Sequence, residues 1–316
     1  MSLNNKKIEM IHSFQLAVQR YKKSLRYVRG EKNVIQKIFH NLRIFGIGYV
    51  IYVLSRFRVP ILFGSMQARL FLGREMSLPM NDVGSSVYVL YGILPHKSER
   101  RFTLWMIHNL KDTDVFFDVG AHLGYYIALA EYSISSGEVH SFEANKKLCR
   151  YLDSNFKESP HVYHSCIALA DIVGTVEFYD ASHVEDSSVS SRFNLTAKSG
   201  AMSLIHATTI DAYVASGKQP PTIIKLDIEG GEYDALQGSS NVLRKHTLQI
   251  LMEVWEGDMG RKYSHDAVVF LQGLGYEAFV IMDDGFVLPT PIADSMVYLS
   301  SVPGEARDNF LFSMSS

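Results

Sequence analysis

The sequence predicts an α/β fold with a mostly parallel sheet that helices cover on both faces. Three observations predict it. From Asp114 onward, short apolar segments alternate with segments of helical periodicity. An acidic residue ends several of the apolar segments, and a glycine-bearing turn follows the first of them. Strands that alternate with helices along a chain form parallel sheets covered on both faces.

The expected strands are short runs rich in β-branched and aromatic residues. They cover Val115–Asp118, Glu138–Phe142, His161–Cys166, Thr222–Leu226, Leu248–Val254, Tyr276–Met282 and Asn309–Ser313. Residues Gly174–Tyr179 alternate like one arm of a hairpin, and Ala207–Ile210 could pair beside them. The helices expected between these strands cover Tyr125–Ser133, Lys147–Phe156, Glu232–Leu243 and His265–Leu274.

Residues 1–66 are expected to form a basic, mostly helical extension, followed by a single domain over residues 67–316. Residues 1–60 hold twelve Lys and Arg side chains and only two acids, Glu9 and Glu31. Such an arm could contact an anionic partner, of which a membrane surface is more plausible than a nucleic acid. It could equally be a solvated helical appendage. A hairpin over Ala68–Leu78 and a helix over Ser98–Leu110 are expected next.

The most apolar segment, Ile44–Leu54, is too short to span a bilayer, which takes roughly 20 residues. It could lie in a membrane interface or dock the arm onto the rest of the chain. Only two cysteines occur, Cys149 and Cys166, without a CxxC pair. They are expected to be reduced, buried thiols in a cytoplasmic protein, and no zinc site is expected.

Three strands end in an acid, at Asp118, Glu143 and Asp227. In open α/β sheets, ligands bind at the carboxyl ends of strands. Core strands do not need carboxylates there, because desolvating an unpaired carboxylate is costly. The three acids therefore predict a ligand site.

The turn after the first strand, Gly120–Gly124, has the spacing Gly-x-x-x-Gly. Dinucleotide sites use G-x-G-x-x-G, whose amides receive a pyrophosphate. The middle glycine is missing here, and the carboxylate of Asp118 would repel a pyrophosphate but suits an ammonium group. Glu143 follows Gly124 by 19 residues, a spacing suited to holding ribose hydroxyls. These features favour S-adenosylmethionine (SAM) over NAD.

Longer segments resemble the FkbM family of SAM-dependent methyltransferases. The resemblance extends from about Leu70 to Phe312, and the segments that carry it are FFDVGAHLGYY, HSFEANKKLCRYLDSNF, IALADIVGTVEFY, TTIDAY and IIKLDIEGGEYDALQG. The resemblance implies a class I methyltransferase fold (Rossmann-like) with a seven-stranded sheet, and O-methylation of a hydroxyl on a sugar, glycan or other natural product. Residues 1–60 lie outside it.

Carried over by position, the resemblance implies three groups of cofactor-binding residues. Asp118, Gly120 and Gly124 belong to the first motif, Glu143 would hold the ribose, and the segment Ala168–Asp171 would border the adenine. The full set expected to bind SAM is Asp118, Gly120, Ala121, His122, Gly124, Tyr125, Glu143, Ala144, Ala168 and Leu169.

Asp227 and Glu229, in KLDIEGGE, are the candidates for the catalytic step. A hydroxyl nucleophile gains from a base within hydrogen-bond reach. The two carboxylates lie on the same side if the chain is extended, and could act as base and orienter or jointly hold a divalent cation. Alternatively, Glu229 caps the next helix and the glycines at 230 and 231 only allow a tight turn.

Four further side chains are open to two interpretations. His122 could stack near the cofactor or face solvent, and His183 could be a base or an idle loop residue. Glu253 could contact the substrate or pair with a Lys or Arg. Trp255 could stack on a sugar ring or simply pack. The rival functions for the whole chain are an NAD-dependent oxidoreductase on a similar sheet and a non-catalytic cofactor-binding relative.

Overall fold

The computed structural model describes residues 3–30, 64–79, 83–180, 201–255, 264–302 and 307–314. The chain divides into two compact units, Met1–Arg100 and Arg101–Ser316. Helix α5 (Lys97–Asn109), expected over Ser98–Leu110, contains the division between them. The expected domain division between residues 66 and 67 stays a prediction.

The first unit contains a long helix, a hairpin and a shorter helix. α1 (Leu3–Gly30) confirms the expected helical periodicity, and the ring of Phe14 meets Phe71 edge-on, with centroids 5.1 Å apart. β1 (Ser65–Arg69) and β2 (Glu75–Pro79) form the expected hairpin, and α4 (Val83–Tyr91) follows it. Gly73 turns the hairpin with a positive φ of 88°.

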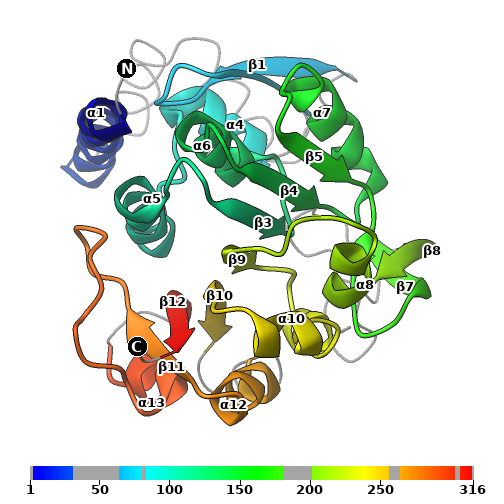
Figure 1. Cartoon of the computed structure of the whole chain (residues 1–316). Helices are drawn as coiled ribbons and strands as arrows, with labels where there is room; N and C mark the ends of the chain where they lie inside the picture. Colours follow the sequence, from blue (N-terminus) through cyan, green and yellow to red (C-terminus); the bar gives the residue numbers. More distant parts are fainter. Residues whose placement is uncertain are drawn as a thin grey trace. The chain divides into compact units, whose positions relative to one another are not determined.

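The second unit is built on a seven-stranded sheet with the order β11-β12-β10-β9-β3-β4-β5 (Figure 1). The strands are β3 (Val115–Val119), β4 (Glu138–Phe142), β5 (Val162–Ser165), β9 (Ile223–Leu226), β10 (Gln249–Trp255), β11 (Tyr276–Val280) and β12 (Arg307–Met314). All neighbours are parallel except β12, which runs antiparallel to both β10 and β11. The predicted mostly parallel sheet is confirmed.

The direction in which the sheet grows reverses between β3 and β9. From β3 the chain adds β4 and β5 on one side, and it then returns to place β9 and β10 on the other. Such a topological switch point leaves a crevice at the carboxyl ends of the two central strands, where open α/β sheets bind ligands.

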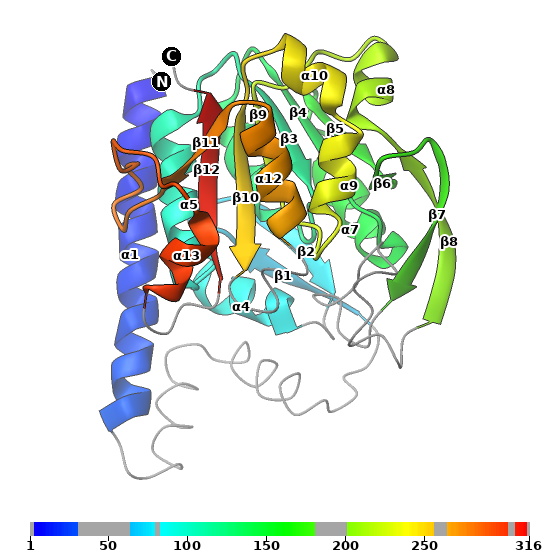
Figure 2. The ribbon, with the colours of Figure 1, turned by 90° about the horizontal axis from the view of Figure 1, so that it is seen from below.

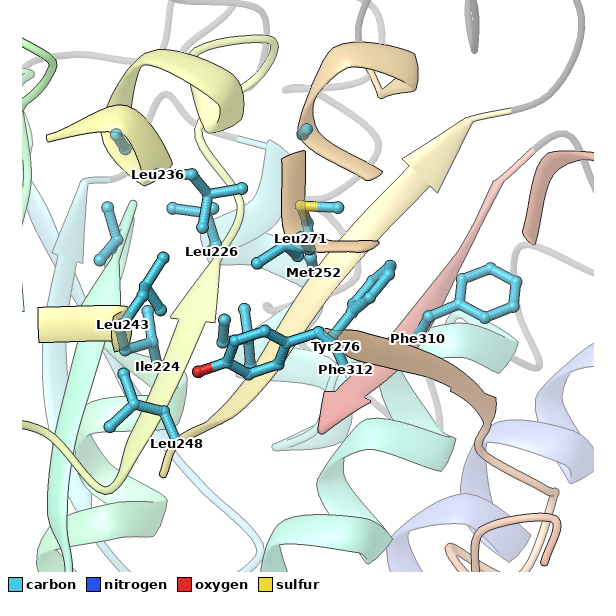
Figure 3. Close-up of a cluster of buried hydrophobic side chains, with 14 of the residues drawn as sticks. Ile224, Leu226, Leu236, Leu243, Leu248, Met252, Leu271, Tyr276, Phe310 and Phe312 are labelled. Carbon is cyan, nitrogen blue, oxygen red and sulfur yellow. The ribbon is translucent and has the colours of Figure 1, made fainter. Parts of the chain in front are cut away.

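Helices cover both faces of this sheet. On one face lie α8 (Ile210–Ala215), α9 (Glu232–Gln237), α10 (Ser240–Lys245), α12 (His265–Gly273) and α13 (Ser295–Ser300), whose buried side chains join one apolar cluster with the strands. Figure 2 shows α9, α10 and α12 in front of the strands. Their side chains meet those of the central strands in Figure 3, which labels Ile224, Leu226, Leu236, Leu243, Met252 and Leu271 among others. On the opposite face of the sheet, α6 (Tyr125–Ser133) contacts β3 and β4. The ring of Tyr126, at the start of α6, lies beneath the ammonium group of Lys225 from β9.

One predicted helix is two. The segment Glu232–Leu243 divides into α9 and α10 at Gly238. A Cβ atom at this position would lie 2.1 Å from the carbonyl oxygen of Ala170, so the close approach of another backbone selects glycine here. The periodicity of the segment did not reveal this tertiary contact.

A separate three-stranded sheet has the order β6-β8-β7. β7 (Gly174–Asp180) pairs with β8 (Ala201–Thr208). Of the expected partner segment Ala207–Ile210 only Ala207 pairs with β7, and Ile210 begins α8, so the bounds of this second strand were wrong. β6 (Ala168–Leu169) pairs with the end of β8. The serine-rich segment 182–203 is therefore partly strand, and its residues 182–200, with His183, lie outside the described residues.

The two cysteines form a disulfide, so the expectation of reduced, buried thiols is wrong. Cys149 lies in α7 (Lys146–Phe156) and Cys166 directly follows β5, with Cα atoms 5.7 Å apart. Cys149 is buried and Cys166 exposed. The chain folds back from α7 into β5 and so joins residues 17 positions apart. Since reduced thiols were a reason to expect a cytoplasmic location, that location stays a prediction.

Within the described ranges, no helix is long and apolar enough to cross a membrane. The apolar segment Ile44–Leu54 lies outside these ranges. Membrane contact through the basic arm stays a prediction.

Candidate active site

The candidate site lies at the carboxyl ends of β3, β4 and β9, at the switch point. The glycine turn follows β3, Glu143 follows β4 and Asp227 follows β9. The structure therefore brings together the three loops that carry most of the predicted site residues.

The glycine turn is shaped by contacts inside the protein. Gly120 and Gly124 have positive φ values of 84° and 85°. A Cβ atom on Gly120 would lie 1.9 Å from the carbonyl oxygen of Asp227, and one on Gly124 would lie 2.7 Å from the ring of Phe156. Both glycines are thus selected by backbone conformation and by close packing.

The amides of this turn are already used. Those of Gly120 and Ala121 both donate to the carbonyl of Phe142, at 3.0 and 3.1 Å, and that of Gly124 donates to Ala121. The amide of His122 donates to the Glu143 carboxylate at 2.8 Å. A dinucleotide site needs such amides for its pyrophosphate. The amides of Gly120, Ala121, His122 and Gly124 are therefore already bonded within the protein and are not available to a pyrophosphate.

Glu143 is held in a fixed orientation. Besides the amide of His122, its carboxylate accepts the amide of Asn145 at 2.8 Å, one bond to each oxygen. The residue is half-buried, and each carboxylate oxygen can accept a further hydrogen bond. Two ribose hydroxyl groups are suitable donors. The geometry fits the role expected for Glu143.

The residues expected to border the adenine lie in two neighbouring apolar clusters. Ala144 packs against a cluster that contains Ala168, and Leu169 is buried in the neighbouring core. Because Ala144 directly follows Glu143, the first of these clusters lies beside the expected ribose position. An adenine ring would find an apolar border there.

Asp118 does not point into an open crevice. Its side chain is fully buried, and the ammonium group of Lys225 lies 3.2 Å away. The two residues stand opposite each other on the paired strands β3 and β9. Burial raises the pKa of Asp118 to about 6, while the charge of Lys225 opposes the shift. A cation of the chain itself therefore stands where the sequence suggested a cofactor ammonium group.

Tyr125 and His122, which were also expected to bind SAM, have different surroundings from each other. The side chain of Tyr125 is buried, and its hydroxyl lies 3.2 Å from that of Thr103, so it packs in the core. His122 adopts a left-handed backbone with φ 49°, and its Nε2 atom is buried without a hydrogen-bond partner among the described residues.

Asp227 and Glu229 lie on a turn, not on an extended segment. The side chain of Asp227 is 31% exposed, and its carboxylate lies 3.5 Å from the Lys225 ammonium. Glu229 has a left-handed backbone with φ 53°, followed by Gly230 with φ 99°. The condition for both carboxylates to share one side is therefore not met. The N-cap position of α9 is occupied by Gly231, not by Glu229.

Glu232, which the sequence analysis missed, shapes this turn. It is buried, and one carboxylate oxygen accepts the amides of Ile228 and Gly230 at 3.0 and 3.2 Å. The signal in the sequence was an acid at the start of a helix directly after two glycines. Because both bonded amides lie between Asp227 and Gly231, this carboxylate holds the loop that carries both catalytic candidates.

The comparisons with known proteins identify the family of the chain. Residues 118–278 match the model of the methyltransferase FkbM domain. The chain belongs to the FkbM methyltransferase family. It is thus a SAM-dependent methyltransferase, and the sheet order is that of the class I fold the family predicts. The alternative of an NAD-dependent oxidoreductase is not favoured.

Individual relatives of this FkbM methyltransferase are distant. The hexuronic acid methyltransferase AglP of Haloferax volcanii is 24% identical over 174 residues, which cover 54% of this chain and 69% of that protein. The structure of methyltransferase FkbM from Methylobacillus flagellatus KT is 16% identical with a TM-score of 0.44, covering 67% of this chain. This chain spans about half (47%) of its length. An O-methyltransferase from Bacillus cereus in complex with SAH is 11% identical with a TM-score of 0.38, covering 70% of this chain and 82% of that chain.

A second charged group lies at the end of β10 in this methyltransferase. Glu253 pairs with Arg307 at 3.1 Å, and the Arg307 guanidinium lies 4.8 Å from the centre of the Trp255 ring. Of the two interpretations of Glu253, pairing with a cation is therefore the one observed. The sequence did not single out Arg307, because the antiparallel return of β12 brings it beside β10. Burial acts to lower the pKa of Arg307, but the nearby charges of Glu253, Glu229 and Asp227 together raise it.

Among the described residues, no group of three His, Cys, Asp or Glu side chains is placed to hold a metal ion. A divalent cation held by Asp227 and Glu229 would need further ligands.

Replacing Glu232 with glutamine should change how stability depends on pH. Burial raises the pKa of Glu232 to about 7, from 4.5 in an ordinary environment. As the pH rises, the unfolded chain releases this proton at a lower pH than the folded chain does. The wild type therefore loses stability between about pH 4.5 and pH 7. Glutamine does not titrate and can still accept both amides. Relative to wild type, the free energy of unfolding of Glu232→Gln should therefore rise by on the order of 3 kcal/mol between pH 4.5 and pH 8.

Urea denaturation at the two pH values measures this difference. The exposed Glu158 provides the control, and Glu158→Gln should track the wild type at both. A constant stability difference between Glu232→Gln and wild type across the range would contradict the prediction.

Proposed function

We propose that this methyltransferase transfers a methyl group to the hydroxyl oxygen of a sugar-like acceptor. The observation that carries the proposal is the partly exposed carboxylate of Asp227, which follows the central strand β9 directly beside the glycine turn. The name of the hexuronic acid methyltransferase AglP supports the acceptor class.

We further propose that SAM lies across the ends of β3 and β4. The oriented carboxylate of Glu143 would accept the ribose hydroxyls, and Ala144, Ala168 and Leu169 would border the adenine. The backbone of Gly120–Gly124 would line the methionine portion of SAM. The buried carboxylate of Asp118 would lie behind this turn. Bound SAM supplies an electrophilic methyl group on a sulfonium centre.

In the proposed reaction, Asp227 accepts the proton of the acceptor hydroxyl while the new O–CH₃ bond forms and the C–S bond breaks. General bases of this kind contribute about 10²- to 10⁴-fold to rate. Alignment of the acceptor oxygen with the methyl group supplies a further large share of the rate enhancement. Glu229 lies two residues further along the same turn, and its role as the residue that orients the acceptor stays a prediction.

Labelled SAM tests this proposal on an extract of the protein's own cell. The expected product is a glycan or small sugar that carries the label as an O-methyl ether, located by mass spectrometry after hydrolysis. A matched reaction with the Glu143→Ala variant controls for other enzymes. Label on nitrogen or carbon would contradict O-methylation. Cofactor binding with no labelled product would support the non-catalytic alternative.

Asp227→Asn should lower kcat on the labelled acceptor by about 100-fold or more, since asparagine cannot take the proton. The affinity for S-adenosylhomocysteine (SAH), measured by calorimetry, should change less than about threefold, because most of the cofactor contacts remain. The exposed Asp266 at the start of α12 gives the matched control, and Asp266→Asn should keep wild-type kcat. Equal kcat for Asp227→Asn and wild type would remove Asp227 from the mechanism.

A further inference from the structure

Lys225 is a buried lysine at the centre of the site. Its side chain is 6% exposed, and it leaves β9 toward the face that carries α6. Burying an ammonium group is costly unless it is paired and hydrogen-bonded. A lysine inside a parallel sheet at a switch point therefore needs a specific set of partners.

The described partners of Lys225 come from β3, from the glycine turn that follows it, from the loop after β9 and from α6. Its ammonium lies 3.2 Å from Asp118 and donates a 3.1 Å hydrogen bond to the carbonyl of Gly120 in the cofactor turn. It also lies 3.5 Å from the carboxylate of Asp227, in the loop that follows β9. The ring of Tyr126 lies below it, with the centroid 5.5 Å from the ammonium, a favourable cation–π position. The ammonium group of Lys225 thus contacts both the turn proposed to line the cofactor and the carboxylate proposed to face the acceptor.

The two carboxylates differ in what they need from this cation. Asp118 is fully buried, and Lys225 is the opposite charge that allows it to ionise there. Asp227 is 31% exposed and could be solvated without help. Neutralisation therefore explains the contact with Asp118, whereas the contact with Asp227 fixes where that side chain points.

We propose that Lys225 is a positioning residue that holds the Asp227 carboxylate beside the cofactor turn, facing the methyl group to be transferred. The inference rests on the proposed role of Asp227 and adds to it a residue that need not touch either substrate. The competing explanation is that Lys225 only neutralises Asp118.

A charge-matched double variant separates these explanations. Lys225→Met with Asp118→Asn removes one positive and one negative charge, so the net charge of the group formed by Asp118, Lys225 and Asp227 stays at −1. Neither replacement leaves a buried charge unpaired, which protects the fold. Asp227 is retained but loses its tether.

Two cofactor analogues provide a measurement that needs no acceptor. SAH lacks the transferable methyl group, whereas sinefungin carries an ammonium-bearing carbon in place of the methyl-sulfonium centre. The ratio of their dissociation constants reports on a carboxylate at the transfer position. Effects on the contacts that both ligands share cancel in this ratio.

Calorimetry with SAH and sinefungin is done on wild type, Asp118→Asn, Asp227→Asn and the double variant, with the melting temperature of each. We expect Asp227→Asn and the double variant to lose the preference for sinefungin by about tenfold each, and Asp118→Asn to keep it within about threefold. Unchanged preference in the double variant, together with a loss in Asp227→Asn, would overturn the positioning role alone. Unchanged preference in Asp227→Asn would overturn the placement of Asp227 itself, and the positioning role with it.

Discussion

Glu143→Ala is expected to weaken SAH binding by at least about 100-fold. Hydrogen bonds to a charged acceptor contribute about 1.5–3 kcal/mol each, and two ribose hydroxyls would lose theirs. The loss is larger than that of an isolated surface carboxylate, because the bonds from His122 and Asn145 have already oriented this one. An acceptor oriented before binding does not lose side-chain freedom when the cofactor arrives.

Isothermal titration with SAH measures the effect, and circular dichroism checks that the variant is folded. Glu158 gives the matched control, since it is an exposed glutamate just beyond α7. Glu158→Ala should bind SAH within about twofold of wild type, as most surface substitutions have small effects. A folded Glu143→Ala variant with wild-type affinity would remove the ribose-binding role and the proposed cofactor position.

Gly120→Ala is expected to destabilise the protein by roughly 3 kcal/mol or more. An L-residue in the left-handed region costs about 1–2 kcal/mol, and forcing a methyl group into packed structure costs about 1–3 kcal/mol more. The obstacle is the backbone carbonyl of Asp227, only 1.9 Å from the new Cβ, which cannot rotate away as a side chain can. The variant should also displace the loop that carries Asp227 and lower methyl transfer.

Gly217 separates the two causes. It too has a positive φ, 98°, but a Cβ atom there would meet nothing within 4 Å. Gly217→Ala should therefore show only the backbone cost of about 1–2 kcal/mol, while Gly120→Ala shows that cost and the clash. Urea denaturation of both variants gives the comparison. Equal destabilisation would mean that the turn and the Asp227 loop adapt freely to each other.

These two predictions depend on contacts that the sequence could only partly foresee. The alternation of apolar runs and helical segments predicted the strands β3, β4 and β9 to within about a residue, because buried parallel strands need continuous apolar runs. An acid after each run then predicted that Glu143 and Asp227 would meet at one edge of the sheet. Both do lie at that end of the sheet, where Glu143 follows β4 and Asp227 follows β9, with β3 between the two strands.

The partner of each acid was not predictable in the same way. Asp118 looked like a ligand for a cofactor ammonium, yet it faces Lys225, a residue 107 positions later in the chain. Glu253 meets Arg307 only because β12 returns antiparallel to β10. Lys225 and Arg307 have no local signal, as a basic residue within an apolar run or at a strand end has many possible partners.

By itself, the sequence determined the seven strands of the main sheet and the helices α6, α7 and α12, the glycine turn, the acids at the strand ends and the family. All of these depend on residues close together in the chain, whose spacing sets backbone period and turn geometry. The tertiary structure decided the disulfide between Cys149 and Cys166, the break at Gly238 and the pairing of Lys225 with Asp118 and Asp227. Each of these depends on segments that meet only after the chain has folded back on itself, and no local spacing records such a meeting.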